Sequence, residues 1–242
     1  MVSVCIPTYN GEKFIKRQLE TIICQLNNED EIIISDDGST DNTLLIISKF
    51  NDSRIKIFHH KPQKRKCNFD LTTRNLENAL QNARGEFIFL ADQDDIWAKD
   101  KVKKILPLLK KYDLVLHDCD IIDENDKLLK KSYFEKIKSS KGIVKNIYKN
   151  SYLGCCMAFR DSIVGKIMPF PKNEIPHDIW IGLICEYYGT VKFFNERLVN
   201  YRRHGNNLSA SSEKSNNSII FKLKYRVIIV NEFIKKIFFS KK

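Results

Sequence analysis

Three aspartates occupy four consecutive positions directly after an apolar run in the middle of the sequence. They are Asp92, Asp94 and Asp95, and they follow the run 87–91. Like charges held this close repel one another, so a fold that keeps them together needs a cation or raises a carboxyl pKa. Oxygen ligands suit Mg²⁺ or Mn²⁺, which in turn bind diphosphates. Capping of a helix predicted over 98–112 would explain Asp95 but not all three, so we predict a metal or ligand site.

A second acidic cluster follows another apolar run, 32–35. It consists of Asp36 and Asp37, with Gly38 and Ser39 after them. Taken alone, this pattern is typical of a turn that leads into a helix. Its expected position beside the loop 7–10 favours a second interpretation, because carboxylates at strand ends can accept hydrogen bonds from a ribose or from the N–H of a uracil-like base.

Three further segments carry weaker signals. Asp178 lies in the segment 176–180, where the simplest interpretation is the start of a helix with His177 on its surface. The segment 201–207 is basic and includes His204, and it could be only the end of a strand. The pair at 117–118, a histidine and an aspartate, follows the apolar run 114–116, and we expect it to face a bound sugar or acceptor.

The elements that must position these residues alternate along the first half of the chain. Helical spacing connects the predicted strands, which cover 2–6, 32–35, 55–58 and 87–91. This alternation predicts an α/β fold with a doubly wound, mostly parallel sheet, in which ligands bind beyond the carboxyl ends of the strands. Neither G-x-G-x-x-G nor G-x-x-x-x-G-K-[ST] occurs, which excludes a dinucleotide fingerprint and a P-loop. In the second half we predict strands over 114–116 and 153–159, and two short strands around Asn195.

In this order and spacing, three motifs resemble the signature of glycosyltransferase family 2. The motifs are Ile6-Pro7-Thr8-Tyr9-Asn10, Ser35-Asp36-Asp37-Gly38-Ser39-Thr40-Asp41, and Arg84-Gly85-Glu86 leading into Asp92-Gln93-Asp94-Asp95-Ile96-Trp97. The resemblance covers roughly residues 1–210 and implies the GT-A fold. Its Rossmann-like nucleotide-sugar-binding half would span 1–97 and its acceptor-binding half 98–212, followed by a tail over 213–242. The D-Q-D-D-x-W form is similar to a bacterial rhamnosyltransferase-like branch that builds surface polysaccharides.

The resemblance also implies a role for each matching residue. Asp178 would be the general base that takes the proton from the acceptor hydroxyl. The metal ligands would be Asp94, Asp95 and His204. The residues that bind the nucleotide would be Pro7, Thr8, Tyr9, Asn10, Asp36, Asp37, Asn75, Asp92 and Arg202. The residues near the sugar or acceptor would be His117, Asp118, His177 and Trp180.

These assignments imply an inverting, Mn²⁺- or Mg²⁺-dependent enzyme. It would move a single sugar from a UDP- or dTDP-linked donor to a glycan or lipid-linked acceptor. A sugar-1-phosphate nucleotidyltransferase stays an alternative, although the loop 7–11 lacks the Arg and Lys that such an enzyme would be expected to carry there. A nucleic-acid-binding module is the other alternative; because no aromatic-basic RNA motif occurs, we expect no nucleic-acid partner.

Charge and length place the protein in a wider class. The 242 residues carry 41 Lys and Arg against 30 Asp and Glu, a net charge of +11. With 43% hydrophobic and 29% charged residues, the chain is neither disordered nor collagen-like, and it is long enough for a sizeable core. The seven cysteines form no C-x-x-C pair, and no signal-peptide pattern opens the sequence, so we expect a cytoplasmic protein without disulfides.

The positive charge is concentrated at the end of the chain. Residues 213–242 contain eight bases and two acids, and they therefore carry more than half of the excess. Apolar residues at helical spacing indicate one face of a helix: Ile219, Leu223, Val227, Val230, Ile234 and Ile237. The lysines are too many and too central for a membrane span. We expect a basic amphipathic helix on the anionic inner face of the cell membrane, or one that packs on its own domain or between the subunits of a homodimer.

Overall fold

The computed structural model describes residues 1–61, 68–173, 175–205 and 218–239. Its strands are β1 (Val2–Thr8), β2 (Glu31–Asp36), β3 (Ile55–His59), β4 (Phe87–Leu90), β5 (Ile96–Trp97), β6 (Leu114–Ile122), β7 (Leu128–Lys130), β8 (Met157–Arg160) and β9 (Val191–Arg202). Its α-helices are α1 (Ile15–Ile23), α2 (Thr43–Ser48), α3 (Asn68–Asn82), α4 (Lys101–Leu109), α5 (Tyr133–Ile137), α6 (Ile143–Tyr148), α7 (Val164–Ile167), α8 (His177–Tyr188) and α9 (Ile219–Phe239). Two 3₁₀ turns cover Gly154–Cys156 and Asp161–Ile163.

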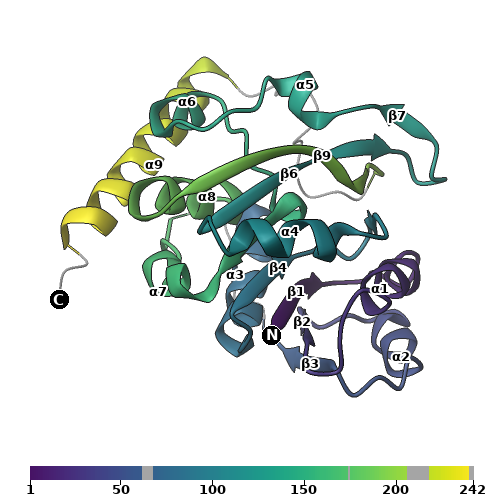
Figure 1. Ribbon diagram of the computed structural model, residues 1–242. Helices are drawn as coiled ribbons and strands as arrows, with labels where there is room; N and C mark the ends of the chain where they lie inside the picture. The colour runs from purple at the N-terminus through teal and green to yellow at the C-terminus, as the bar shows by residue number, and fades with distance from the viewer. Residues whose placement is uncertain (62–67, 174, 206–217, 240–242) are drawn as a thin grey trace.

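The first half of the chain forms the parallel part of the sheet, as the alternation of strands and helices predicts. The strand order is β3-β2-β1-β4, and each neighbouring pair is parallel. Figure 1 shows α1 and α2 on one side of these strands and α3 on the other. Strands covered on both faces are apolar throughout, and the residues of β4 are all buried. The chain leaves β1 toward β2 on one side and returns to β4 on the other, so a crevice is expected at their carboxyl ends.

The second half continues the same sheet with mixed strand directions. β8 pairs antiparallel with both β4 and β6, and β9 pairs parallel with β6. The expectation of a mostly parallel sheet therefore holds for the first half alone. The two short strands predicted around Asn195 are wrong, because β9 is a single strand from Val191 to Arg202. Irregular register between β6 and β9, near His117 and Asp118, lets this long strand follow its partner.

The helix predicted in the tail is present and packs on the body of the protein. α9 runs along α6 and α8 in Figure 1, and the ring of Phe233 meets the ring of Tyr187 on α8 at 5.8 Å. Ile229 is fully buried in this contact. Among the described residues, no helix is long and apolar enough to cross a membrane.

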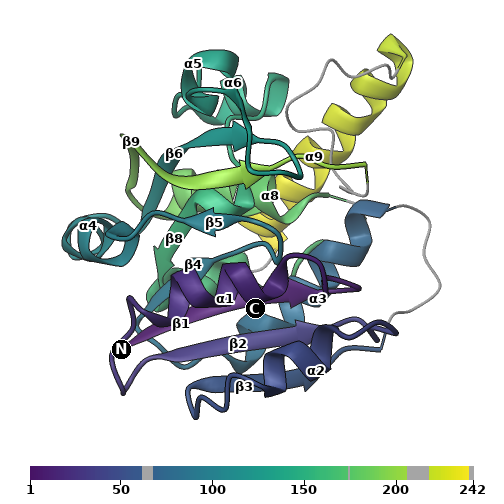
Figure 2. The same ribbon diagram turned by 90° about the vertical axis from the view of Figure 1, so that its right-hand side faces the viewer.

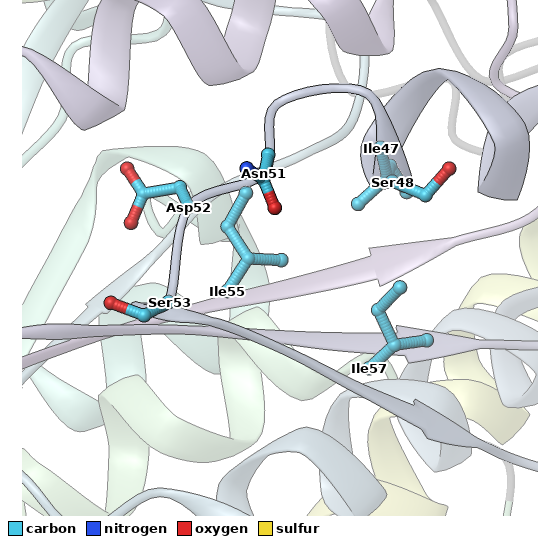
Figure 3. Close-up of a pocket in the computed structure, with 7 residues that line it drawn as sticks. All are labelled: Ile47, Ser48, Asn51, Asp52, Ser53, Ile55 and Ile57. Atoms are coloured by element: carbon cyan, nitrogen blue, oxygen red, sulfur yellow. The ribbon is translucent and has the colours of Figure 1, made fainter.

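A shallow hollow lies beside the edge strand β3, at the amino end of that strand (Figure 3). Its only carboxylate, Asp52, is paired with the Arg54 guanidinium at 2.6 Å. The remaining lining residues are Ile47, Ser48, Asn51, Ser53, Ile55 and Ile57. Because the strand ends that carry the predicted chemistry lie at the opposite edge, this hollow is not part of the candidate site.

Candidate functional site

The loops after β1, β2 and β4 are joined by hydrogen bonds at one edge of the sheet. The Gln93 amide donates to the Tyr9 carbonyl and accepts from the Tyr9 N–H, both at 3.0 Å. Oδ1 of Asn10 accepts the N–H of Thr40 at 2.8 Å. Gly11 leaves room for Gln93, because a side chain at Gly11 would overlap the amide. The three motifs, distant in sequence, therefore form one continuous rim.

The carboxylate of Asp36 shapes this rim by accepting hydrogen bonds from nearby residues of the protein. Its carboxylate accepts hydrogen bonds from the Thr8 hydroxyl at 2.9 Å, the Ser39 hydroxyl at 2.6 Å and the Gly38 and Ser39 N–H groups at 3.0 and 2.8 Å. The residue is fully buried. Gly38 has a φ of +81°, which a residue with a side chain rarely adopts. The predicted nucleotide contact from Asp36 is therefore corrected, since its carboxylate is saturated by donors that shape the loop.

Asp37, the second acidic residue of this turn, contacts the end of β1 and a histidine after β3. Its N–H donates to the Thr8 carbonyl at 3.0 Å, and its Oδ1 meets Nδ1 of His60 at 2.5 Å. Asn75, on α3, donates to the same Thr8 carbonyl at 3.0 Å, while Oδ1 of Asn75 is buried without a partner among the described residues. Tyr9, the residue after Thr8, is 55% exposed. An unsatisfied amide oxygen beside a carboxylate and an exposed ring suits a nucleoside base.

In the acidic motif after β4, in contrast to the fully bonded Asp36, two carboxyl groups have raised pKa values. Burial raises the pKa of Asp92 to about 7, with further contributions from the charges of Asp94 and Asp178. Burial, followed by the charges of Asp94 and Asp92, holds the pKa of Asp95 well above its ordinary value. Oδ2 of Asp95 is buried without a hydrogen-bond partner among the described residues. Asp92 and Asp95 are thus held close to Asp94 with raised pKa values, and Asp95 keeps one oxygen without a hydrogen-bond partner among the described residues.

This arrangement fits a divalent cation. Ligand atoms of Asp92, Asp95 and Cys155 lie within 4.8 Å of one another. Asp94 is beside them, and its Oδ2 meets Nε2 of His204 at 2.7 Å. Carboxylate oxygens and an imidazole nitrogen are suitable ligands for Mn²⁺, and a cation would relieve the repulsion that raises these pKa values. Asp94 and His204 thus contact each other next to this group, and the assignment of Asp94, Asp95 and His204 as metal ligands stays a prediction.

Arg202 fixes the position of the acidic motif through both its side chain and its backbone N–H. Its Nε donates to the Asp94 carbonyl at 2.7 Å, and its backbone N–H donates to Oδ1 of Asp95 at 2.9 Å. The guanidinium also pairs with Asp126 at 2.6 Å, in the turn between β6 and β7, and lies over the ring of Phe14. The predicted pairing of Arg202 with a phosphate is corrected, because this side chain is 3% exposed and bound to the protein. Asp95 likewise does not cap a helix, since α4 begins at Lys101.

A buried lysine lies behind the motif. Lys101 is fully buried, its Nζ donates to the Cys155 carbonyl at 2.9 Å, and it lies 3.8 Å from the centre of the Trp97 ring. Burial lowers its pKa to about 8, while the charges of Asp95 and Asp92 oppose that change. A fixed ammonium group at this position partly offsets the charge of the acidic motif.

Asp178 faces the acidic motif from the start of α8. Its Oδ1 accepts the Ile179 N–H at 2.7 Å and its Oδ2 accepts from Nδ2 of Asn150 at 3.3 Å. Burial raises the pKa of Asp178 to about 6, and its charge also raises the pKa of Asp92. The carboxyl is partly exposed and has a capacity for further hydrogen bonds. A carboxylate that is mostly ionised at pH 7 but basic for its type can accept a proton.

The neighbouring His177 lies against Gly154, where any side chain would overlap the imidazole. Burial lowers the pKa of His177 to about 4, so the ring is neutral at pH 7. It can therefore offer a hydrogen bond to an acceptor without adding a charge to the cleft.

Three residues predicted near the sugar or acceptor lie elsewhere. Trp180 is 1% exposed and donates through Nε1 to the Ile167 carbonyl at 3.0 Å, so it belongs to the core. His117 is fully buried on β6, where burial holds its pKa well below the ordinary value. Asp118 accepts from the Ser132 hydroxyl and from the Cys119 and Phe134 N–H groups, and it thereby anchors the segment before α5. These three predicted contacts are wrong in this structure.

Other residues contribute to the site without a signal in the sequence analysis. The amide of Gln93, which lies between two aspartates of the acidic motif, joins two loops. His60 and Asn150 lie far in sequence from the carboxylates that they contact. The ring of Phe14 lies 5.1 Å from that of His204. Lys101 is the exception, because the sequence shows it near the start of the helix predicted over 98–112 and close to the acidic motif.

The family description that matches this chain is Glycosyl transferase family 2, over residues 3–168. An uncharacterised glycosyltransferase of Nostoc sp. is 29% identical over 88% of this chain and 69% of its own length. The Escherichia coli UDP-Glc:alpha-D-GlcNAc-diphosphoundecaprenol beta-1,3-glucosyltransferase WfgD is 28% identical over 76% of this chain and 70% of its own length. The crystal structure of S. aureus TarS 1-349 in complex with UDP-GlcNAc superposes with a TM-score of 0.69, at 19% identity, over 97% of this chain and 72% of that one. The last comparison shows a common fold, and the GT-A expectation is confirmed.

Proposed function

This chain belongs to glycosyl transferase family 2, and from that premise we propose that it transfers a single sugar with inversion at the anomeric carbon. The donor would be a UDP- or dTDP-linked sugar and the nucleophile an acceptor hydroxyl. The observation that carries the proposal is the position of Asp178, a partly exposed carboxylate whose charge acts on Asp92 in the acidic motif. A single displacement needs one base and one electrophilic site, and it needs no enzyme nucleophile.

In this mechanism the chain binds the donor at the rim and the acceptor beside α8. Asp37 and the exposed ring of Tyr9 would contact the base, and the buried amide of Asn75 would orient it. Asp92 would contact the ribose. Asp178 would accept the proton of the acceptor hydroxyl as that oxygen attacks, while Asn150 and the Ile179 N–H hold the carboxylate in place.

Mn²⁺ or Mg²⁺ would be held by Asp94, Asp95 and His204, with Asp92 nearby. When bound, the cation would supply charge stabilisation for the departing nucleoside diphosphate. The residues around it then have separate tasks: Arg202 fixes the backbone of the motif, and the ring of Phe14 keeps His204 beside Asp94. Lys101 limits the negative charge from the protein side.

The acceptor would be a glycan or a lipid-linked oligosaccharide. The name of the E. coli relative specifies a diphosphoundecaprenol acceptor, which supports a lipid-linked one here. An enzyme with such an acceptor would work at the inner face of the cell membrane, where α9 and its basic residues could bind peripherally. Self-association through α9 to a homodimer is the competing use of that helix.

Substitution of the proposed base tests the mechanism. Asp178→Asn keeps the size of the side chain but cannot accept the proton, so we expect transfer to fall by between about 10²- and 10⁴-fold. Affinity for UDP, measured by calorimetry, should stay within about twofold if the fold is intact. Asp161→Asn, an exposed carboxylate at the start of a 3₁₀ turn, is the matched control and should keep full activity. Residual transfer near the wild-type rate in Asp178→Asn would remove this residue as the base.

A further inference from the structure

α9 has two apolar faces, and only one of them is covered by the protein. The packed face consists of Tyr225, Ile229, Phe233 and Ile237, which follow one another at steps of four. This face is not the stripe expected from the sequence, because Leu223, Val227 and Ile234 of that stripe are exposed. A helix that only packed on its own domain would have no reason to carry a second apolar face.

The exposed face runs along the helix in two apolar parts, which are separated by the exposed Asn231. Its residues recur at steps of three, four, seven and four, a spacing that places them on one side of a helix. The residues of this face are Ile220, Leu223, Val227, Ile234 and Phe238, and the exposed fractions of these residues run from 43% to 80%. We name these five residues the outer stripe. Isolated exposed apolar residues are ordinary on a protein surface, but an aligned row of this length marks an interaction site.

The outer stripe continues onto α6. Arg226, which adjoins Leu223 and Val227 on the helix, donates to the Tyr148 carbonyl at 2.9 Å and lies 4.6 Å from the centre of the Tyr148 ring. Tyr148 is 71% exposed, and Val144, one turn before it, is 82% exposed. Figures 1 and 2 show α6 beside α9 in both views. The two neighbouring helices therefore both carry exposed apolar side chains, and Arg226 joins them.

Basic residues surround this surface. α9 carries five basic residues and one acid, Glu232, which is bound to Asn173 and Lys235. Lys224 and Lys235 are exposed beside the outer stripe. From 136 to 160, the segment that includes α6, the sequence has no acidic residue, and Lys141, Lys145 and Lys149 are exposed. An apolar surface bordered by cations is complementary to a lipid bilayer with anionic headgroups.

We propose that the outer stripe, together with Val144 and Tyr148, is a docking surface for an anionic lipid bilayer. The apolar side chains enter the boundary between headgroups and acyl chains, and the flanking lysines contact the headgroups. α9 remains attached to the body through its packed face, so the membrane is held in a fixed orientation to the enzyme. This inference rests on the proposed lipid-linked acceptor for its purpose, but its physical basis is the surface itself.

Vesicle flotation of the full chain tests the surface. The protein should float with vesicles that contain phosphatidylglycerol and not with vesicles of phosphatidylcholine alone. Replacement of the stripe by Leu223→Gln, Val227→Gln and Ile234→Gln together should weaken binding by at least about tenfold. The matched control is Leu45→Gln, Leu128→Gln and Leu129→Gln, three equally exposed apolar residues elsewhere, and it should bind like the wild type.

The charged border is tested separately. Lys224→Gln with Lys235→Gln should weaken binding to the anionic vesicles by about thirtyfold, whereas Lys110→Gln with Lys111→Gln should leave it unchanged. Retained flotation in the stripe variant, or equal binding to neutral vesicles, would overturn the proposal. A second outcome would also overturn it: neither protein floats, and sedimentation shows a dimer for the wild type but a monomer for the stripe variant. The surface would then bind a second copy of the chain. Flotation needs no donor and UDP binding needs no vesicles, so a failure of this surface is distinguishable from a failure of the proposed reaction.

Discussion

Asp36 after β2 and the aspartates after β4 occupy the same position in two neighbouring units of the fold, yet their surroundings differ. Asp36 has four donors from its own chain and no capacity left for a ligand. Asp92 and Asp95 are also buried or nearly so, but Asp95 keeps an oxygen without a partner and both have raised pKa values. The number of internal donors, rather than residue type or position, separates a carboxylate that builds a loop from one prepared to bind a ligand.

The comparison predicts that the two kinds of aspartate fail differently when they are substituted. Loss of a saturated carboxylate should cost stability, because its donors are left buried without a partner. Loss of a carboxylate that lacks hydrogen-bond donors should lower activity. The protein without ligand or metal should then be as stable as before, or more stable. Three substitutions test this contrast, and we give them from the largest expected effect to the smallest.

Asp94→Ala should lower transfer by about 10²- to 10³-fold, because the group removed acts on the charge that builds up on the leaving diphosphate. Metal-dependent binding of UDP should weaken as well, and calorimetry with and without Mn²⁺ measures both. Asp123→Ala, in the turn between β6 and β7, is the control for removal of a carboxylate near Arg202. If Asp94→Ala binds UDP and Mn²⁺ like the wild type, the metal assignment fails.

Asp36→Ala should lower the free energy of unfolding by about 2–4 kcal/mol, since two N–H groups and two hydroxyls lose their acceptor in a buried turn. Urea denaturation measures the change. The matched control is again Asp123→Ala, whose carboxylate accepts two N–H groups in an exposed turn and should cost less than about 1 kcal/mol. Equal losses in the two variants would contradict the claim that the buried donors of Asp36 make its carboxylate important for stability.

Asp92→Asn should stabilise the metal-free protein, and the gain should depend on pH. The pKa of Asp92 is about 7 in the folded protein and near the ordinary aspartate value of 3.8 when unfolded. Ionisation therefore destabilises the folded state progressively as the pH rises from about 4 through 7, and the asparagine variant avoids this loss. We expect no difference at pH 4 and a gain of about 1–2 kcal/mol at pH 8, because partial exposure screens the effect.

Denaturation in the presence of a chelator, at both pH values, measures that gain. A stability difference that is the same at pH 4 and pH 8 would show that the charge of Asp92 is not the cause. Addition of Mn²⁺ should reverse the order, since a cation bound to the wild-type carboxylates stabilises the folded state alone.

Much of the first half could be predicted from the sequence because its signals are local. β1, β2, β3 and β4 lie within two residues of the predicted strands at each end, and the motifs fall at their carboxyl ends. A buried strand must be apolar and a tight turn needs Gly38 or its equivalent, so both features are visible in a few residues. The absence of disulfides is also confirmed for the six cysteines that the structure describes.

The second half was less predictable because contacts distant in sequence decide it. His117, Asp118 and Trp180 have residue types that suit a binding site, but burial assigns them to the core and to a loop anchor. α9 shows the same limit. The sequence shows the helical spacing of its apolar residues, but which face of the helix is packed depends on where α6 and α8 lie.

The sequence by itself determined the family, the alternation of strands and helices in the first half and the set of carboxylates available for chemistry. These depend on residue type and short spacing, which the chain carries wherever it folds. Only the tertiary structure decided which carboxylates are free to bind. The donors that saturate Asp36 come from Thr8 and from its own turn, while Lys101, whose charge acts on Asp92 and Asp95, bonds instead to the Cys155 carbonyl. Hydrogen bonds and burial are properties of neighbours in space, and for this site those neighbours come from all along the chain.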